Sequence, residues 1–239
     1  MNTDSSDHVC IEDCYISTGD DMVSIKSGWD EYGISYGRPS TDIVINRLAG
    51  QSGIGSGIAI GSEMSGGVSE VRAEDIRISN SAAAIRIKTS PGRGGYVRNI
   101  YVSNVNMVGV DTAIRFTGQF GEHPDEFYDP TALPLIERIT IKDVVGERIK
   151  SAGLLEGLEG DTFRNVCLWN ITLDIGMSIL KESPWNCSHI EGFSELVSPE
   201  ICEPLKERIY PQHFSDCYHL SNHLWRSSDP NRVARLLSW

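Results

Sequence analysis

The sequence predicts an all-β fold, and within that class a right-handed parallel β-helix, in which short strands stack in successive coils. Apolar and polar residues alternate over three to five residues, which is the period of a strand. A two-strand unit recurs with similar internal spacing, and the 23 glycines lie mainly at the ends of these runs, where sharp corners need unusual φ values. A β-sandwich is the competing all-β fold. The short strands and the recurring unit favour the β-helix, whose coils cover one another's edges.

The predicted strands follow one another in a regular order. Six segments place two apolar residues around one that points away, usually with Asn or Asp nearby: Val9-Cys10-Ile11, Ile43-Val44-Ile45, Ile76-Arg77-Ile78, Ile100-Tyr101-Val102, Ile139-Thr140-Ile141 and Val166-Cys167-Leu168. A second run follows most of them: Val23-Ser24-Ile25, Ile58-Ala59-Ile60, Ile85-Arg86-Ile87, Ile114-Arg115-Phe116 and Leu154-Leu155. Each coil thus offers at least two strands. We expect one parallel sheet to align Ile43, Ile76, Ile100, Ile139 and Val166.

Length and composition indicate one extended domain. The chain has 239 residues, 40% of them hydrophobic, and no apolar run approaches the length of a membrane span. Its net charge of −12 argues against a nucleic acid partner. We expect the β-helix to occupy residues 1–210, followed by an irregular or disordered tail over 211–239. The three histidines of that tail lack the spacing of a metal site, so we expect no metal.

Three aspartates fall on turns beside short strand runs near the start of the chain. They are Asp4, in Asn2-Thr3-Asp4, and the adjacent pair Asp20 and Asp21. Hydrolysis of a glycosidic bond needs one carboxylic acid to protonate the leaving oxygen and one carboxylate to handle water, so clustered aspartates suit it. The alternative is a pair of solvated turns, which Asp favours through its own side-chain hydrogen bonds.

A cluster of basic residues offsets the acidic composition locally. Arg86-Ile87-Lys88 puts two cations on one face of a short strand, and Arg93 and Arg98 follow closely. An ordinary solvated strand face would give the same pattern. If the cations instead gather at a site, they suit an anionic polysaccharide.

These pieces, taken in order, resemble glycoside hydrolase family 28, the polygalacturonases, and within it the plant polygalacturonase-like proteins. The similarity covers roughly residues 1 to 205 and rests on four motifs, each weak by itself. They are Asn2-Thr3-Asp4 for the first catalytic motif, Gly19-Asp20-Asp21 for the paired aspartates, the segment 52–63 for the Gly-His-Gly motif, and Arg86-Ile87-Lys88 for the basic substrate-binding motif.

The resemblance implies the pectin lyase-like form of the β-helix and inverting hydrolysis of α-1,4-linked galacturonate in pectin. Asp20 would be the general acid, Asp4 and Asp21 would position and deprotonate water, and stacking of the coils would bring Asp4 next to the Asp20–Asp21 turn. Arg86 and Lys88 would hold the carboxylate of the substrate. The implied partner is galacturonan, with no cofactor and no membrane.

The resemblance also implies a secreted protein of the extracellular space or cell wall. Six cysteines allow fifteen pairings. Cys187 and Cys202 resemble a pair with which the family ties down its C-terminal segment. The first catalytic motif follows Met1 directly and no signal peptide is visible, so we expect an N-terminally truncated β-helix, the C-terminal portion of such an enzyme.

Two departures from the family pattern keep a second function open. The position of the motif His is taken by Ser56 or Gly55, depending on how the glycines are aligned. Phe120 lies near the position where the family has its active-site Tyr, and Tyr128 is the alternative residue for that role. A non-catalytic pectin-binding β-helix therefore stands beside the hydrolase. A pectate lyase is the weakest interpretation, because the aspartates resemble the hydrolase motif, and exo or endo action stays open.

Overall fold

The computed structural model describes residues 1–176 and 183–206, so the predicted boundary at 210 and the tail 211–239 lie outside the described residues. The elements are β1 (Asn2–Asp4), β2 (Asp7–Thr18), β3 (Val23–Lys26), α1 (Asp30–Tyr36), β4 (Ser40–Ser52), β5 (Ser56–Ile60), β6 (Val68–Ser79), β7 (Ala83–Lys88), β8 (Tyr96–Val108), β9 (Thr112–Thr117), β10 (Leu135–Ile149), β11 (Ser151–Glu156), β12 (Phe163–Ile175), β13 (Trp185–Ser188), β14 (Ile190–Ser198) and η1 (Glu203–Leu205).

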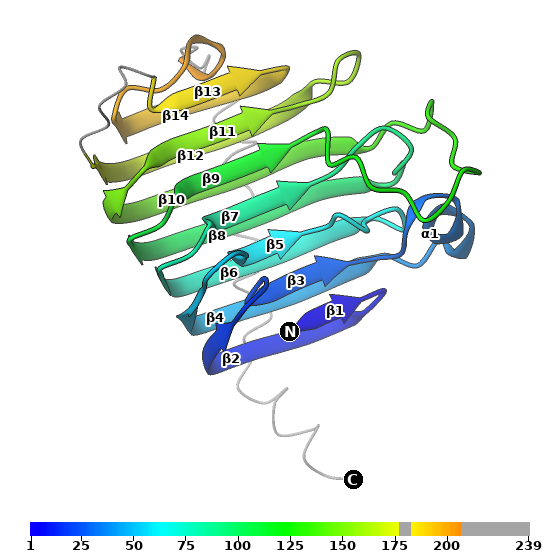
Figure 1. Cartoon of the computed structure of the whole chain (residues 1–239), viewed down its shortest axis with the longest axis horizontal. Coiled ribbons are helices and arrows are strands. Elements are labelled where there is room, and N and C mark those ends of the chain that lie inside the picture. The colour runs from blue at the N-terminus through cyan, green and yellow to red at the C-terminus, as the bar shows by residue number, and fades with distance from the viewer. Residues whose placement is uncertain (177–182, 207–239) are drawn as a thin grey trace, which may run out of the picture.

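The strands form two layers that alternate along the chain. The odd-numbered strands make a sheet in the order β1-β3-β5-β7-β9-β11-β13, and the even-numbered strands make a sheet in the order β14-β12-β10-β8-β6-β4-β2. All pairs between these strands are parallel, and each coil gives one strand to each layer (Figure 1). This is the parallel β-helix, and the absence of paired hairpin strands in the described ranges excludes the β-sandwich.

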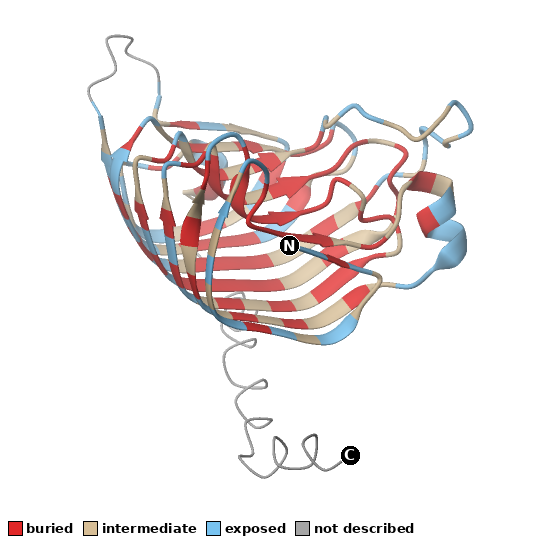
Figure 2. Ribbon diagram, turned by 60° about the horizontal axis from the view of Figure 1, so that its bottom comes forward, coloured by how far each residue is buried: buried red, intermediate tan, exposed pale blue. Residues whose placement is uncertain are grey.

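The core is a set of apolar ladders between the two layers, visible as buried stripes in Figure 2. In the odd-numbered layer the predicted second runs are in register throughout. Ile25 pairs with Ile60, Ile60 with Ile87 and Ile87 with Phe116, and all four are at most 3% exposed. Residues between these positions point outward, so this layer presents a regular outer face across its strands.

One register prediction is wrong. Ile43 pairs with Val71 and Val71 with Ile100, whereas Ile76 pairs with Leu48 and Val105. Ile76 belongs to the second half of the same long strand, β6, after a change of direction. The sheet is parallel and otherwise in register as expected, since Ile100 continues to Ile139 and Val166 in β10 and β12.

The change of direction comes from two columns of bends that run through the even-numbered layer. Each bend is a non-glycine residue with φ near +50°, and the columns are His8, Asp42, Glu70, Asn99, Arg138 and Asn165, and then Asp13, Arg47, Asp75, Asn104, Asp143 and Asn170. Asn and Asp tolerate this conformation best among non-glycine residues. Their side chains also link coils, as where Asn170 Nδ2 donates to Asp143 Oδ1 over 2.7 Å. The Asn and Asp residues near the apolar triplets are therefore corner residues.

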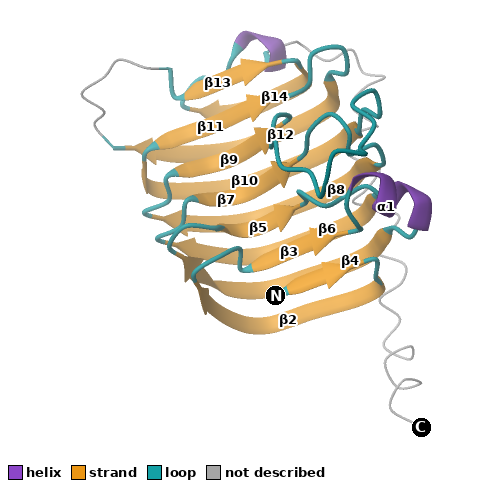
Figure 3. Cartoon of the chain, turned by 45° about the vertical axis from the view of Figure 1, so that its right-hand side comes forward, coloured by secondary structure: helices purple, strands orange, loops and turns teal. Residues whose placement is uncertain are grey.

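Helix α1 is an element that the sequence patterns did not predict. It follows β3 and ends at Gly37, whose φ of 60° and N–H bond to the Gly33 carbonyl oxygen close the last turn. Figure 3 shows α1 beside the loops that follow the strands of the odd-numbered layer. A hydrogen bond of 2.6 Å from Tyr32 Oη to Asp125 ties α1 to the loop after β9.

The last coil is closed by a disulfide between Cys187 and Cys202, the pair that the family resemblance implied. Cys10 and Cys14 are free; Cys10 is exposed and Cys14 is half-buried. Within the described ranges, no helix has the length and apolar character needed to cross a membrane.

Candidate active site

The two adjacent aspartates lie in the turn that leads into β3. Ser52, in the next coil, fixes this turn, since its Oγ donates to the Asp20 carbonyl oxygen over 2.6 Å and accepts the Gly55 N–H over 2.9 Å. Gly55 packs so closely that a Cβ there would lie 2.4 Å from the Asp20 carbonyl carbon and from the Asp21 nitrogen. A side chain at position 55 would therefore displace the aspartate turn.

Asp21 is buried and held by two donors from different coils. Its Oδ1 accepts the backbone N–H of Ser56 over 2.8 Å, and its Oδ2 accepts Lys88 Nζ over 2.7 Å. Burial raises the pKa of Asp21, but the hydrogen bond and charge of Lys88, together with the Ser56 N–H, outweigh it and hold this pKa below its usual value. Asp21 is therefore ionised at neutral and mildly acidic pH.

Asp20 has a different environment from its neighbour. It is exposed to solvent, and its Oδ1 accepts the backbone N–H of Asp21 over 2.8 Å. Among the described residues no cation forms an ion pair with Asp20, whereas Lys88 pairs with Asp21. Two neighbouring carboxylates in unlike surroundings are the usual basis for dividing acid and base roles in a glycosidase.

Asp4 is placed differently from the expectation. It ends β1 opposite Lys26, and its Oδ1 accepts the N–H of Gly28 over 3.1 Å and the hydroxyl of Ser5 over 3.0 Å. The residues of β1 pair with positions 24–26 and not with the turn before β3. The structure therefore brings Asp4 to the adjacent strand, but no hydrogen bond among the described residues connects it to the aspartate turn.

The basic strand β7 lies within electrostatic reach of that turn. Lys88 forms an ion pair with Asp21, and its side chain is 11% exposed. Arg86 is half-buried; burial and the charge of Arg115 lower its pKa, while the carboxylates of Asp21 and Asp20 act to raise it. The structure thus gathers both aspartates and both cations of the basic motif into one cluster.

An aromatic ring from the loop after β9 covers the two cations. The Phe120 ring centroid lies 5.4 Å from Arg86 Cζ and 5.5 Å from Lys88 Nζ, at distances typical of cation–π contact. Tyr128 instead stacks on His123, with ring centroids 3.5 Å apart. Phe120 is therefore the aromatic residue at the basic motif, and Tyr128 belongs to a separate contact.

Ser56, one of the two residues expected at the place of the motif His, also lies at the site. It begins β5 and is completely buried, and its backbone N–H holds Asp21. Its Oγ has no hydrogen-bond partner of good geometry in the described part of the chain. The position therefore contributes a backbone donor and no titrating side chain.

Two ion pairs, one half-buried and one fully buried, were not predicted from the sequence. Lys26 Nζ lies 2.7 Å from Glu63 Oε1. Burial raises the pKa of Glu63, but the hydrogen bond and charge of Lys26 outweigh this effect, so the pKa is below its usual value. Arg93, which the sequence placed in the cluster of basic residues, is completely buried and pairs with Asp30 of α1. Arg93 is thus a structural residue that ties the chain after β7 to α1, and it is not available to a ligand.

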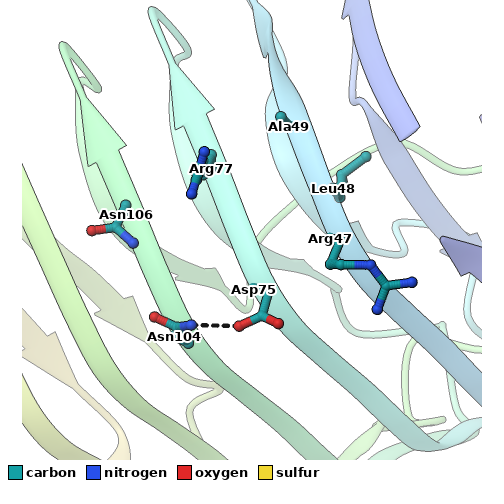
Figure 4. A pocket seen from close by; sticks show the side chains of 7 residues that line it. All are labelled: Arg47, Leu48, Ala49, Asp75, Arg77, Asn104 and Asn106. Atoms are coloured by element: carbon teal, nitrogen blue, oxygen red, sulfur yellow. Dashed lines mark hydrogen bonds between the residues drawn. The ribbon is translucent and has the colours of Figure 1, made fainter. Parts of the chain in front are cut away.

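A hollow on the opposite layer shows no comparable chemistry. Figure 4 shows its lining on β4, β6 and β8: Arg47, Leu48, Ala49, Asp75, Arg77, Asn104 and Asn106. Its one carboxylate, on Asp75, accepts a hydrogen bond from Asn104 at a coil corner. Because the hollow offers no second carboxylate, the aspartate turn and β7 remain the candidate site.

Known proteins are similar to this chain in both sequence and fold. A probable polygalacturonase from Vitis vinifera is 47% identical over 208 residues, which are 87% of this chain and 42% of that protein. An exopolygalacturonase structure from Thermotoga maritima matches with a TM-score of 0.67 and 33% identity, over 72% of this chain and 38% of that one. The chain therefore spans less than half the length of these relatives.

A second structure supports the fold. The polygalacturonase from Erwinia carotovora ssp. carotovora matches with a TM-score of 0.59 and 24% identity, over 81% of this chain. These polygalacturonases are right-handed parallel β-helices, and the predicted fold class is confirmed. The family model for glycosyl hydrolases family 28 matches residues 1–198. The chain therefore belongs to glycosyl hydrolases family 28.

Proposed function

We propose that this protein hydrolyses α-1,4-galacturonosyl linkages in pectin and polygalacturonate by an inverting carboxylate mechanism. Family membership and the names of its relatives support the substrate class. The observation that carries the mechanism is the unlike environment of two adjacent aspartates, with Asp21 buried and ionised and Asp20 exposed without a bonded cation.

In this mechanism Asp20 donates its proton to the glycosidic oxygen as the bond to the anomeric carbon breaks. Water attacks that carbon from the opposite face and loses its proton to a carboxylate, so the new reducing end has the inverted configuration. We assign the positioning of this water to Asp21, which is held ionised by Lys88. Asp4, whose Oδ1 accepts the N–H of Gly28 just after β3, would lie further along the strands from this water.

The proposed substrate is polyanionic, so recognition must come from local positive charge. The chain as a whole carries −12, which makes the cationic cluster of Arg86 and its neighbours the electrostatic exception. Arg86 would hold a substrate carboxylate, and Lys88 would act through Asp21. We further propose a secreted, cell-wall location, with no cofactor, nucleic acid or membrane partner.

The test is release of reducing ends from polygalacturonate by the 239-residue chain and its Asp20→Asn variant. We expect slow release by the chain and none by the variant, with galacturonan binding and far-UV circular dichroism unchanged. General acid catalysis contributes about 10²–10⁴-fold, so the loss is measurable. Equal rates for chain and variant would exclude Asp20 as the acid.

The second candidate is a pectin-binding β-helix without turnover. Ser56 favours it, because this buried hydroxyl stands near the place where the family resemblance expects His. If the chain and its Ser56→His variant both bind polygalacturonate and release no reducing ends, the protein is a pectin-binding β-helix and not a hydrolase. Release that increases in Ser56→His would decide for the hydrolase.

A further inference from the structure

A second arginine lies beside Arg86 on the outer face of the odd-numbered layer. Arg115 pairs in register with Arg86 in the next coil, and one step further the register continues to Leu154 of β11. On the other side Arg86 pairs with Ala59 and Ala59 with Ser24, both short side chains. The outer face therefore carries two adjacent guanidinium groups, bounded by small residues on one side and an apolar residue on the other.

The two guanidinium groups repel each other, and the carboxylates of Asp21 and Asp20 act on Arg86 only through their charge, so a bound anion would reduce the repulsion. Adjacent parallel strands are about 4.8 Å apart, so two like charges start from neighbouring backbone positions. Both side chains are only half-exposed, and the Nε atoms of Arg86 and Arg115 are shielded from solvent without a hydrogen-bond partner in the described residues. No carboxylate of the described chain forms an ion pair with either guanidinium, in contrast to Lys88 and Arg93.

We propose that Arg115, together with Arg86, forms a carboxylate-binding subsite for a second uronate residue of the substrate. A guanidinium presents several N–H donors in a planar fork that matches a carboxylate, and two such groups side by side can share or divide its two oxygens. The Phe120 ring lies beside Arg86 at a distance typical of a cation–π contact, so it can help to orient this guanidinium. Because Lys88 is bonded to Asp21, Arg115 supplies the second free cation of the site.

The subsite rests on the proposed substrate class and deepens it. It predicts that affinity depends on a free carboxylate on a sugar that is displaced from the aspartate turn across the strands, in the direction of β9. Methyl esterification removes that charge and leaves the sugar ring, so it tests the carboxylate alone.

The test is isothermal titration calorimetry of trigalacturonate and of its fully methyl-esterified form, with the chain and with Arg115→Gln. Arg77→Gln is the matched control, since Arg77 is exposed on the outer face of the opposite layer. We expect Arg115→Gln to weaken trigalacturonate binding roughly 10- to 100-fold, the loss of a charge-assisted hydrogen bond, and to leave the ester unchanged. Arg77→Gln should match the unmodified chain on both ligands.

The outcomes separate this inference from the proposed hydrolysis. Unchanged trigalacturonate affinity in Arg115→Gln, or an equal loss on the acid and the ester, would overturn the subsite even if the chain releases reducing ends. If Arg115→Gln weakens binding of trigalacturonate but not of its ester, and the unmodified chain releases no reducing ends, the subsite would be upheld and the hydrolase rejected. If the unmodified chain bound neither ligand, the subsite and the substrate class would both be overturned.

Discussion

Replacing Lys88 by Met should destabilise the fold in a pH-dependent way. Asp21 and Lys88 have side chains that are 6% and 11% exposed, and removing one partner of such a buried pair costs about 3–5 kcal/mol. The Ser56 N–H would still bond Oδ1 of Asp21, so only Oδ2 loses its donor. We therefore expect the lower end of this range, about 3 kcal/mol, at pH 7.

The sign of the pH dependence follows from the lowered pKa of Asp21. In the unmodified chain the stabilisation by this pair is complete above the unfolded carboxyl pKa of about 3.9, and it is lost as pH falls through the lower folded value. In Lys88→Met, burial acts on Asp21 without the cation and raises its pKa. The variant then takes up a proton earlier, and its deficit in unfolding free energy shrinks as the pH falls.

The assay is urea unfolding followed by circular dichroism at pH 7 and pH 4. Lys150→Met is the control, because Lys150 pairs with Asp111 over 2.6 Å but both side chains are more than half exposed. The double variant Asp21→Asn with Lys88→Met should recover much of the loss, since no buried charge remains. A deficit for Lys88→Met no larger than that for Lys150→Met, or one that does not change with pH, would refute the reasoning.

Three further predictions concern the frame around the site. Gly55→Ala should lower the free energy of unfolding by about 1–3 kcal/mol and any hydrolytic rate about 100-fold, because the new Cβ would move the aspartate turn. Gly53→Ala is the control: a Cβ there meets nothing within 4 Å, so neither unfolding nor rate should change. Ser52→Ala should cost about 1–3 kcal/mol in urea unfolding and Ser56→Ala less, because the Ser52 hydroxyl makes two hydrogen bonds and the Ser56 hydroxyl makes none of good geometry to the described residues. Cys202→Ser opens a disulfide that spans 15 residues and should cost about 3 kcal/mol; no change in unfolding would contradict it.

The fold could be predicted because alternation is a local signal. The ladder through Ile25, Ile60 and Ile87 is visible in the sequence, since each of these strands is short and straight. The wrong register that was predicted for Ile76 shows the limit of this local signal. Strand β6 contains an apolar triplet on each side of the bend at Asp75, and a triplet pattern does not say which half of the coil it occupies.

The sequence motifs predicted that Asp20, Asp21, Arg86 and Lys88 lie together, but they did not predict the contacts between these residues. Asp21 and Lys88 are 67 residues apart, so their ion pair appears only when β3, β5 and β7 are stacked. Arg115 escaped notice because its significance depends on the register of β7 with β9. Arg93 looked like a surface cation because its buried partner, Asp30, lies on a helix that the alternation does not reveal.

The stereochemistry of the first product tests the central claim most directly. Proton NMR during hydrolysis of trigalacturonate distinguishes the two anomers of the new reducing end before they equilibrate. Attack of water opposite the leaving oxygen predicts that the β anomer appears first with the unmodified chain, and that Asp20→Asn gives neither anomer. Initial appearance of the α anomer, or product formation by Asp20→Asn, would contradict the mechanism built on the aspartate turn.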